Sequence, residues 1–256
     1  MVFAGGEVTW RDYYLLLSIP AAALFAWMAL RLKNDAPASR QAPSDDADFD
    51  ADNAHRIDAG SPPPPRADEE TASWKRYAVL VTAGALSGFV YAGFMHFLPR
   101  YLDGSGLEMS GVSPEGMRNR LAALVLVCGV IGQSLAGRLA RPGRLEWLLA
   151  LILLANAPLL GWMALADGAW RVAATCALAL VHFMNQPVYN SLIAQYVPSH
   201  RRSLGYGFSN MAGFTLGGLG PAFAGYAATN LSTYGGLAII AVLAGSVALI
   251  LVAHRR

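Results

Sequence analysis

The sequence predicts an all-α protein, a polytopic membrane helix bundle with seven transmembrane helices. Seven apolar stretches, none with an Asp, Glu, Lys or Arg across its centre, account for most of the 256 residues. Charged residues make up 14% of the chain, well below the roughly 25% of ordinary soluble domains. A helix of about 20 residues crosses the hydrocarbon core and satisfies its own backbone hydrogen bonds there. The stretches lie at about residues 13–30, 77–99, 121–137, 147–166, 172–196, 205–229 and 232–253.

The segment between the first two stretches divides the chain into three parts. Residues 33–76 hold ten acidic and six basic side chains, a run of four prolines and few large apolar groups. Such a composition cannot bury enough apolar surface to offset the entropy of ordering. We therefore expect a lone N-terminal transmembrane helix in residues 1–32 and a disordered, acidic, Pro-rich cytoplasmic linker in residues 33–76. A six-helix transmembrane bundle is expected in residues 77–256.

Basic residues are distributed unevenly between the two sides of the predicted bundle. Fourteen of the 19 Lys and Arg residues fall on the side that carries the linker and the C-terminus. Because Lys and Arg are concentrated in cytoplasmic loops, we expect the C-terminus in the cytoplasm and the N-terminus outside. The expected location is the plasma (inner) membrane.

Polar side chains inside the fifth stretch share one helical face. They follow the spacing i, i+3, i+4, i+7 and i+8 at His182, Asn185, Gln186, Tyr189 and Asn190. Polar groups are costly in a bilayer, so such a face is not expected to contact lipid. It either lines an aqueous cavity that holds a solute or forms a seam of hydrogen bonds between helices. We expect the cavity, because five neighbouring polar groups exceed what a seam usually needs. Pro187 is expected to interrupt the helix within this face.

The second stretch carries a thinner polar face, formed by Gly84, Ser87, Tyr91 and, slightly rotated, His96. Its His96, like His182, can change charge near neutral pH. A proton relay is one interpretation of this pair; a buried neutral histidine is the one we favour. The candidate substrate-binding residues are therefore His182, Asn185, Gln186, Tyr189, Asn190, Tyr91 and His96.

The sixth stretch is rich in glycine around Pro221. Gly213 and Gly217 form a small-xxx-small pair, which allows another helix backbone to approach closely. So many glycines also soften a helix, as a moving part requires. Dense packing is the alternative interpretation, and we expect both to hold.

The sequence contains no phosphate loop, nucleophile elbow or zinc-protease motif, and no span holds paired carboxylates for acid–base chemistry. Cys128 and Cys176 lie inside spans and are interpreted as small buried hydrophobes without a disulfide. We therefore expect a non-enzyme with no catalytic residue, no metal site and no cofactor. The expected partners are a small-molecule solute and the lipid bilayer, with no nucleic acid.

The order of the elements and three loop motifs are similar to one known family. One helix precedes a long cytoplasmic linker and six further helices. The first motif is the turn after the third stretch, Gly137-Arg138-Leu139-Ala140-Arg141-Pro142-Gly143-Arg144. The second lies at the end of the second stretch and reads Phe97-Leu98-Pro99-Arg100-Tyr101-Leu102. The third is Tyr196-Val197-Pro198, followed by Arg201-Arg202 and then by Gly217-Gly218-Leu219-Gly220-Pro221. Together they resemble the C-terminal half of a major facilitator superfamily transporter, from its sixth helix through its central loop to helices seven to twelve. The turn lacks the aspartate that the family often has there.

This resemblance implies secondary active transport of a small solute by alternating access, in which two halves rock about a site at the bilayer midplane. In that family, helices seven and ten line the central cavity, and the two polar faces described above fall on the corresponding stretches. A complete member has about twelve helices, so this chain corresponds to one bundle and a helix. We expect a truncated carrier that lacks its N-terminal half; a second polypeptide or a second copy of this chain would also complete it.

Two other functions have the same helix count. A retinal protein needs a lysine in its last helix, whereas the only lysines here are Lys33 and Lys75, both within the predicted linker. A seven-helix ligand-sensing membrane receptor, or a non-transporting membrane subunit, remains the alternative to a transporter.

Overall fold

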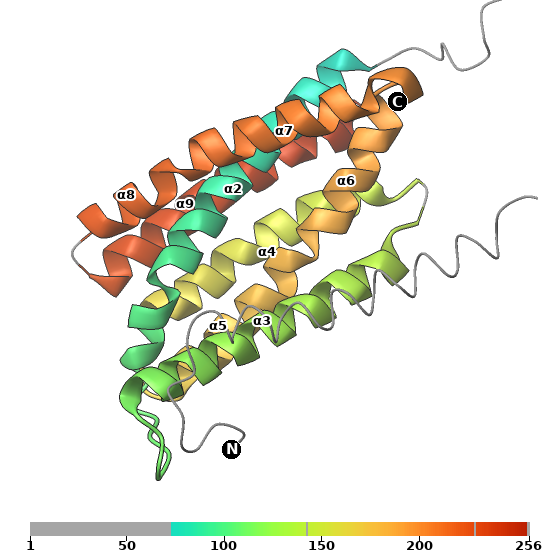
Figure 1. Ribbon diagram of the computed structural model, residues 1–256. Coiled ribbons are helices and arrows are strands. Elements are labelled where there is room, and N and C mark those ends of the chain that lie inside the picture. The colour runs from blue at the N-terminus through green and yellow to red at the C-terminus, as the bar shows by residue number, and fades with distance from the viewer. Residues whose placement is uncertain (1–72, 142, 228, 255–256) are drawn as a thin grey trace, which may run out of the picture. The chain divides into compact units, whose positions relative to one another are not determined.

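The computed structural model describes residues 73–141, 143–227 and 229–254, and every regular element in this part of the chain is a helix, without a β-strand (Figure 1). The predicted lone helix in residues 1–32 and almost all of the predicted linker lie outside the described residues. The first described helix, α2, begins at Trp74, three residues before the start predicted from hydropathy.

Among the described residues, four helices are long and apolar enough to cross a membrane. They are α2 (Trp74–Asp103), α3 (Pro114–Leu139), α4 (Leu145–Leu165) and α9 (Asn230–Ala253). They match the predicted stretches at 77–99, 121–137, 147–166 and 232–253. These four helices do not establish the predicted total of seven transmembrane helices.

The other two predicted spans are each divided into two shorter helices. An interruption was expected in 172–196, at Pro187, whereas the division of 205–229 corrects the expectation of a single helix there. The first comprises α5 (Trp170–Phe183) and α6 (Asn185–Tyr196); the second comprises α7 (Arg202–Gly217) and α8 (Leu219–Tyr226). A short 3₁₀ helix, η2 (Ser199–Arg201), joins α6 to α7. Proline lacks an N–H group, and its ring clashes with the carbonyl four residues earlier. Four residues before Pro187 and Pro221 are Phe183 and Gly217, the last residues of α5 and α7.

Glycines allow α2 to pack closely against α7 and α8. A Cβ atom on Gly88 would lie 2.9 Å from the carbonyl oxygen of Gly213, and one on Gly217 would lie 3.2 Å from that of Gly88. The predicted close backbone approach is therefore confirmed at Gly217, whereas at Gly213 it depends on Gly88, since a Cβ on Gly213 would meet nothing within 4 Å. Further along the same crossing, Gly93 of α2 meets Gly220 of α8.

The buried core consists of two apolar clusters that follow one another along the helices. One lies toward the end where α2 begins and includes Leu80, Leu149, Leu192, Tyr196 and Leu251. The other lies toward the end where α2 finishes and includes Phe94, Leu160, Leu178, Tyr234 and Leu237. The most extensive packing is between α4 and α9, and α2 lies against α9, α7 and α8.

Candidate functional site

A layer of buried polar side chains lies between the two apolar clusters. Ser87 of α2, Asn156 of α4 and His182 of α5 are 4%, 1% and 7% exposed. In α2 and α4, the buried residues on one side of the polar group belong to one cluster and those on the other side belong to the second. His182 lies between buried residues of the second cluster in α5 and the first buried residue of the other cluster, Met184. Three of the buried polar side chains therefore lie near mid-depth of the bundle, where burial without partners costs most.

Two of the predicted polar faces pack against each other. Because α3 and α4 lie between them in the chain, α2 runs antiparallel to the α5–α6 pair. Three contacts follow one another along this crossing. The Tyr189 ring lies against Gly84, where a Cβ would meet it at 2.5 Å. The Asn185 Nδ2 donates to Ser87 Oγ at 3.0 Å, and the rings of Tyr91 and His182 stack with centroids 5.7 Å apart. We call these six residues the polar seam.

The remaining predicted site residues lie at the surface of the described bundle. Gln186 is exposed, and its Oε1 accepts a hydrogen bond from Gln133 Nε2 of α3 at 2.7 Å. Asn190 is exposed, and its backbone carbonyl accepts from the Tyr206 hydroxyl of α7. His96 is also exposed, and its ring contacts the edge of neighbouring Phe97. The structure thus brings Tyr91, His182, Asn185 and Tyr189 together and places the other three outside this contact.

Two buried amide oxygens, Asn185 Oδ1 and Asn156 Oδ1, have no hydrogen-bond partner. An unpaired buried acceptor costs about 1–3 kcal/mol, so each is an acceptor that a bound donor would satisfy. Asn185 lies directly after the break between α5 and α6 at Met184. Sequence reasoning identified Asn185 but missed Asn156. A single Asn in an otherwise apolar stretch, two residues before Pro158, was the available signal.

Sequence reasoning also missed a buried carboxylate at the end of the bundle where α2 begins. Glu146, in the first turn of α4, is 4% exposed. Its Oε1 accepts a hydrogen bond from the Tyr196 hydroxyl at the end of α6, at 3.1 Å. The backbone N–H of Ser73 donates to the Tyr196 carbonyl, so the chain entering α2 is held at the same place. This cluster connects the beginnings of α2 and α4 with the end of α6.

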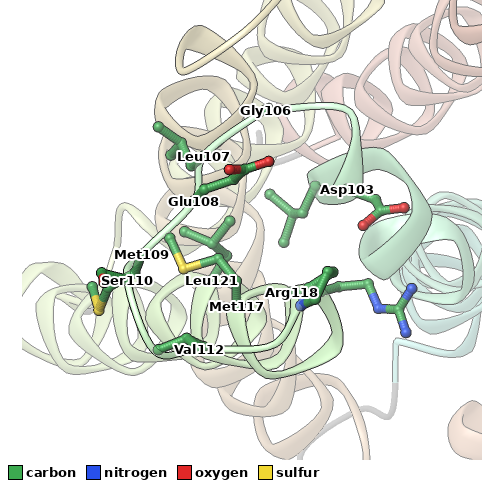
Figure 2. A pocket seen from close by; sticks show the side chains of 12 residues that line it. Asp103, Gly106, Leu107, Glu108, Met109, Ser110, Val112, Met117, Arg118 and Leu121 are labelled. Atoms are coloured by element: carbon green, nitrogen blue, oxygen red, sulfur yellow. The ribbon is translucent and has the colours of Figure 1, made fainter.

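Two surface hollows lie at the opposite end of the bundle, and neither includes a residue of the polar seam. The larger, of about 640 Å³, is formed by the loop between α2 and α3. Figure 2 shows Leu107, Glu108 and Met109 on one side of it and Asp103 and Arg118 on the other. The smaller, of about 250 Å³, lies between the ends of α2 and α8 and the start of α9. Within the described ranges, no group of three or more His, Cys, Asp and Glu side chains could hold a metal ion.

Four long apolar helices, in a described part of the chain whose regular elements are all helices, define an integral membrane protein of the helical-bundle class. The sequence model of the Major Facilitator Superfamily matches residues 1–221. The chain therefore belongs to the major facilitator superfamily, whose members are transporters rather than enzymes. No curated protein and no solved structure matches the chain.

The hydrogen bond between Ser87 and Asn185 provides a direct test of the seam. Replacement of Ser87 by Ala leaves the Asn185 amide without its partner, and we expect a loss of about 1 kcal/mol in unfolding free energy. A double-mutant cycle with Asn185→Ala should give a favourable coupling energy between the two sites. The measurement is reversible unfolding in mixed micelles. Strictly additive effects would show that the two side chains do not interact.

Proposed function

We propose that this chain forms part of a carrier that moves a small solute across the plasma (inner) membrane by secondary active transport and alternating access. The solute binds at the polar seam between α2 and the α5–α6 pair. The observation that carries this proposal is the unpaired Asn185 Oδ1 at the break between α5 and α6. Discontinuous helices at mid-depth are a common place for transporter substrate sites, because a helix break presents unused polar groups there.

The surroundings of Asn185 support a site that a solute enters from one side. Tyr91 stacks on His182, yet 39% of its surface is exposed. Gln186 and Asn190 continue the polar face of α6 along exposed positions. We assign contact with solute to His182, Asn185, Gln186, Tyr189, Asn190, Tyr91 and His96. A second bundle, either an N-terminal half or another copy of this chain, supplies the facing wall.

The charge of the two helix ends supports an orientation with the C-terminus in the cytoplasm. Where α2 begins and α9 finishes, the described helix ends and turns carry seven Lys and Arg residues and one acid, Glu146. At the other end, four arginines are balanced by four acids. Because basic residues are retained on the cytoplasmic side, the first end faces the cytoplasm and the N-terminus of the chain lies outside.

Ligand-induced stabilisation tests whether the seam binds solute. The purified chain is screened against sugars, amino acids, organic ions and drugs by thermal unfolding, since a ligand at 100 times its Kd stabilises by about 2.7 kcal/mol. A solute that raises the unfolding temperature should lose this effect in Asn185→Leu and His182→Leu. Leu165→Ala, at an apolar position that is 75% exposed, is the matched control and should keep it.

The same solute distinguishes half a carrier from a complete one. We expect liposomes that contain only the purified chain to bind the labelled solute. They should not accumulate it inside when a gradient is imposed across the membrane. Robust uptake by the chain alone would contradict the need for a separate N-terminal half and would indicate that another copy of this chain supplies the second bundle. Equal stabilisation of the native chain and both seam variants would place binding somewhere other than the seam.

A further inference from the structure

The crossing of α3 and α5 brings two cysteines together. The helices α3 and α5 are separated in the chain only by α4, which returns across the bundle, so they run parallel, and they pack directly against each other. Gly132 of α3 lies against the backbone of Leu180 in α5, so closely that a Cβ at Gly132 would overlap the Leu180 carbonyl oxygen. Backbones approach this closely only where one helix presents glycine.

The register of this contact places Cys128 opposite Cys176. Each cysteine lies four residues before its contact residue, 128 before 132 and 176 before 180. Residues four apart share one face of a helix. In two parallel helices, the residues one turn before a contacting pair therefore face each other as the next pair. The two thiol groups are near enough to interact with each other. Both cysteines are free and half-buried. The interpretation of them as separate small hydrophobes therefore misses that they form a pair.

We propose that Cys128 and Cys176 are an oxidisable dithiol that closes to a disulfide and fixes α3 to α5. A disulfide needs Cα atoms about 4.4–6.8 Å apart, a separation that the close backbone contact one turn away favours. Both residues lie in the central parts of apolar helices, so the oxidant has to be soluble in lipid. The class that fits is an organic hydroperoxide, such as a peroxidised acyl chain.

The reaction takes place in two balanced steps. One thiol attacks the terminal oxygen of the hydroperoxide; the O–O bond breaks, and a sulfenic acid and an alcohol form, the alcohol oxygen receiving the thiol proton. The second thiol then displaces the hydroxyl group of the sulfenic acid, which leaves with the second thiol proton as water. The sulfur–sulfur bond forms, the two thiols lose two electrons, and the hydroperoxide accepts them.

Intact-mass counting of free thiols tests this proposal. The full chain in lipid nanodiscs is exposed to cumene hydroperoxide, unfolded and treated with N-ethylmaleimide. We expect the native chain to lose both maleimide labels and two hydrogens, and a phosphine reductant to restore both labels. Cys128→Ala and Cys176→Ala should each keep their single label under the same exposure. Tryptic peptides from α3 and α5 should be recovered joined from the native chain only.

A matched pair of glycine variants tests the register. Gly132→Ala should slow disulfide formation several-fold, because the new methyl group pushes α3 away from Leu180. Gly137→Ala, in the same helix with open space around it, should leave the rate unchanged. Retention of both labels by the native chain, or loss of the label at the same rate in the single-cysteine variants, would overturn the proposal. An unchanged rate in Gly132→Ala would overturn the assignment of the pair to this helix contact.

Discussion

Replacement of Gly220 by Ala is expected to lower the unfolding free energy of the bundle by about 1–3 kcal/mol. A Cβ at this position would overlap the carbonyl oxygen of Phe89 and lie 2.8 Å from the backbone nitrogen of Gly93. Both obstacles are backbone atoms of α2, so a change of rotamer cannot relieve the clash. Either α8 moves away from α2 along its length or the backbone deforms, and both responses lose packing that was close before.

Gly207→Ala is the matched control. It adds the same methyl group to the α7 helix, where nothing lies within 4 Å of the new atom. In an unobstructed helix, Gly→Ala stabilises by about 0.5–1 kcal/mol through backbone entropy. The two variants should therefore move the unfolding transition in detergent in opposite directions. A stabilising effect of Gly220→Ala, equal to that of Gly207→Ala, would contradict the close contact between α2 and α8.

Hydropathy was sufficient to predict the helices that are both long and apolar. The starts and ends of α2, α3, α4 and α9 agree with the predicted stretches within a few residues at most ends, because the lipid requirement sets both length and composition. The length of α2 and α3 beyond the apolar part was less predictable. Their ends at Asp103 and Pro114 lie outside the hydrophobic segment, where turn chemistry rather than hydropathy decides.

The helix breaks could be predicted only in part. Pro187 was identified as an interruption, but Pro221 was read mainly as part of a flexible, glycine-rich helix. Pro99 and Pro158 lie inside α2 and α4 without ending either helix. A proline removes one hydrogen bond wherever it occurs, and the packing around it, which the sequence does not display, determines whether the helix ends.

The candidate site was predicted as two separate faces, and their pairing could not be derived from periodicity. Spacing placed His182, Asn185 and Tyr189 on one face and Tyr91 on another helix, but the register between the helices depends on Gly84 and Ser87. A small residue opposite each larger one allows the seam to close. Asn156 was missed for a related reason, because a single polar residue has no periodic pattern. Its burial, where α4 packs against neighbouring helices, depends on the tertiary structure.

Both interpretations of the polar face have support from the described contacts. The bond between Asn185 and Ser87, and that between Gln186 and Gln133, are helix–helix hydrogen bonds of the kind that a structural seam requires. The unpaired Asn185 Oδ1 and the exposed part of Tyr91 are not explained by such a seam. They are the features that favour a solute path, and the accessibility of this face to water distinguishes the two.

Cysteine accessibility at the α6 end of the seam tests this central claim most directly. Single cysteines replace Asn185, Gln186 and Tyr189 in a chain whose Cys128 and Cys176 are changed to Ala, and the labelling is done in native membranes. Because a thiol reacts as its thiolate, which needs water or a cation nearby, a membrane-impermeant maleimide reports hydration. The matched control is Ile239→Cys in α9, an apolar position that is 64% exposed.

We expect at least one of the three seam cysteines to react about tenfold faster than the Ile239→Cys control, since thiolate formation is suppressed in apolar surroundings. Solutes that stabilise the native chain should slow this labelling. If all three positions react no faster than the control, the polar face is a sealed contact between helices, and the assignment of the solute site to it is contradicted.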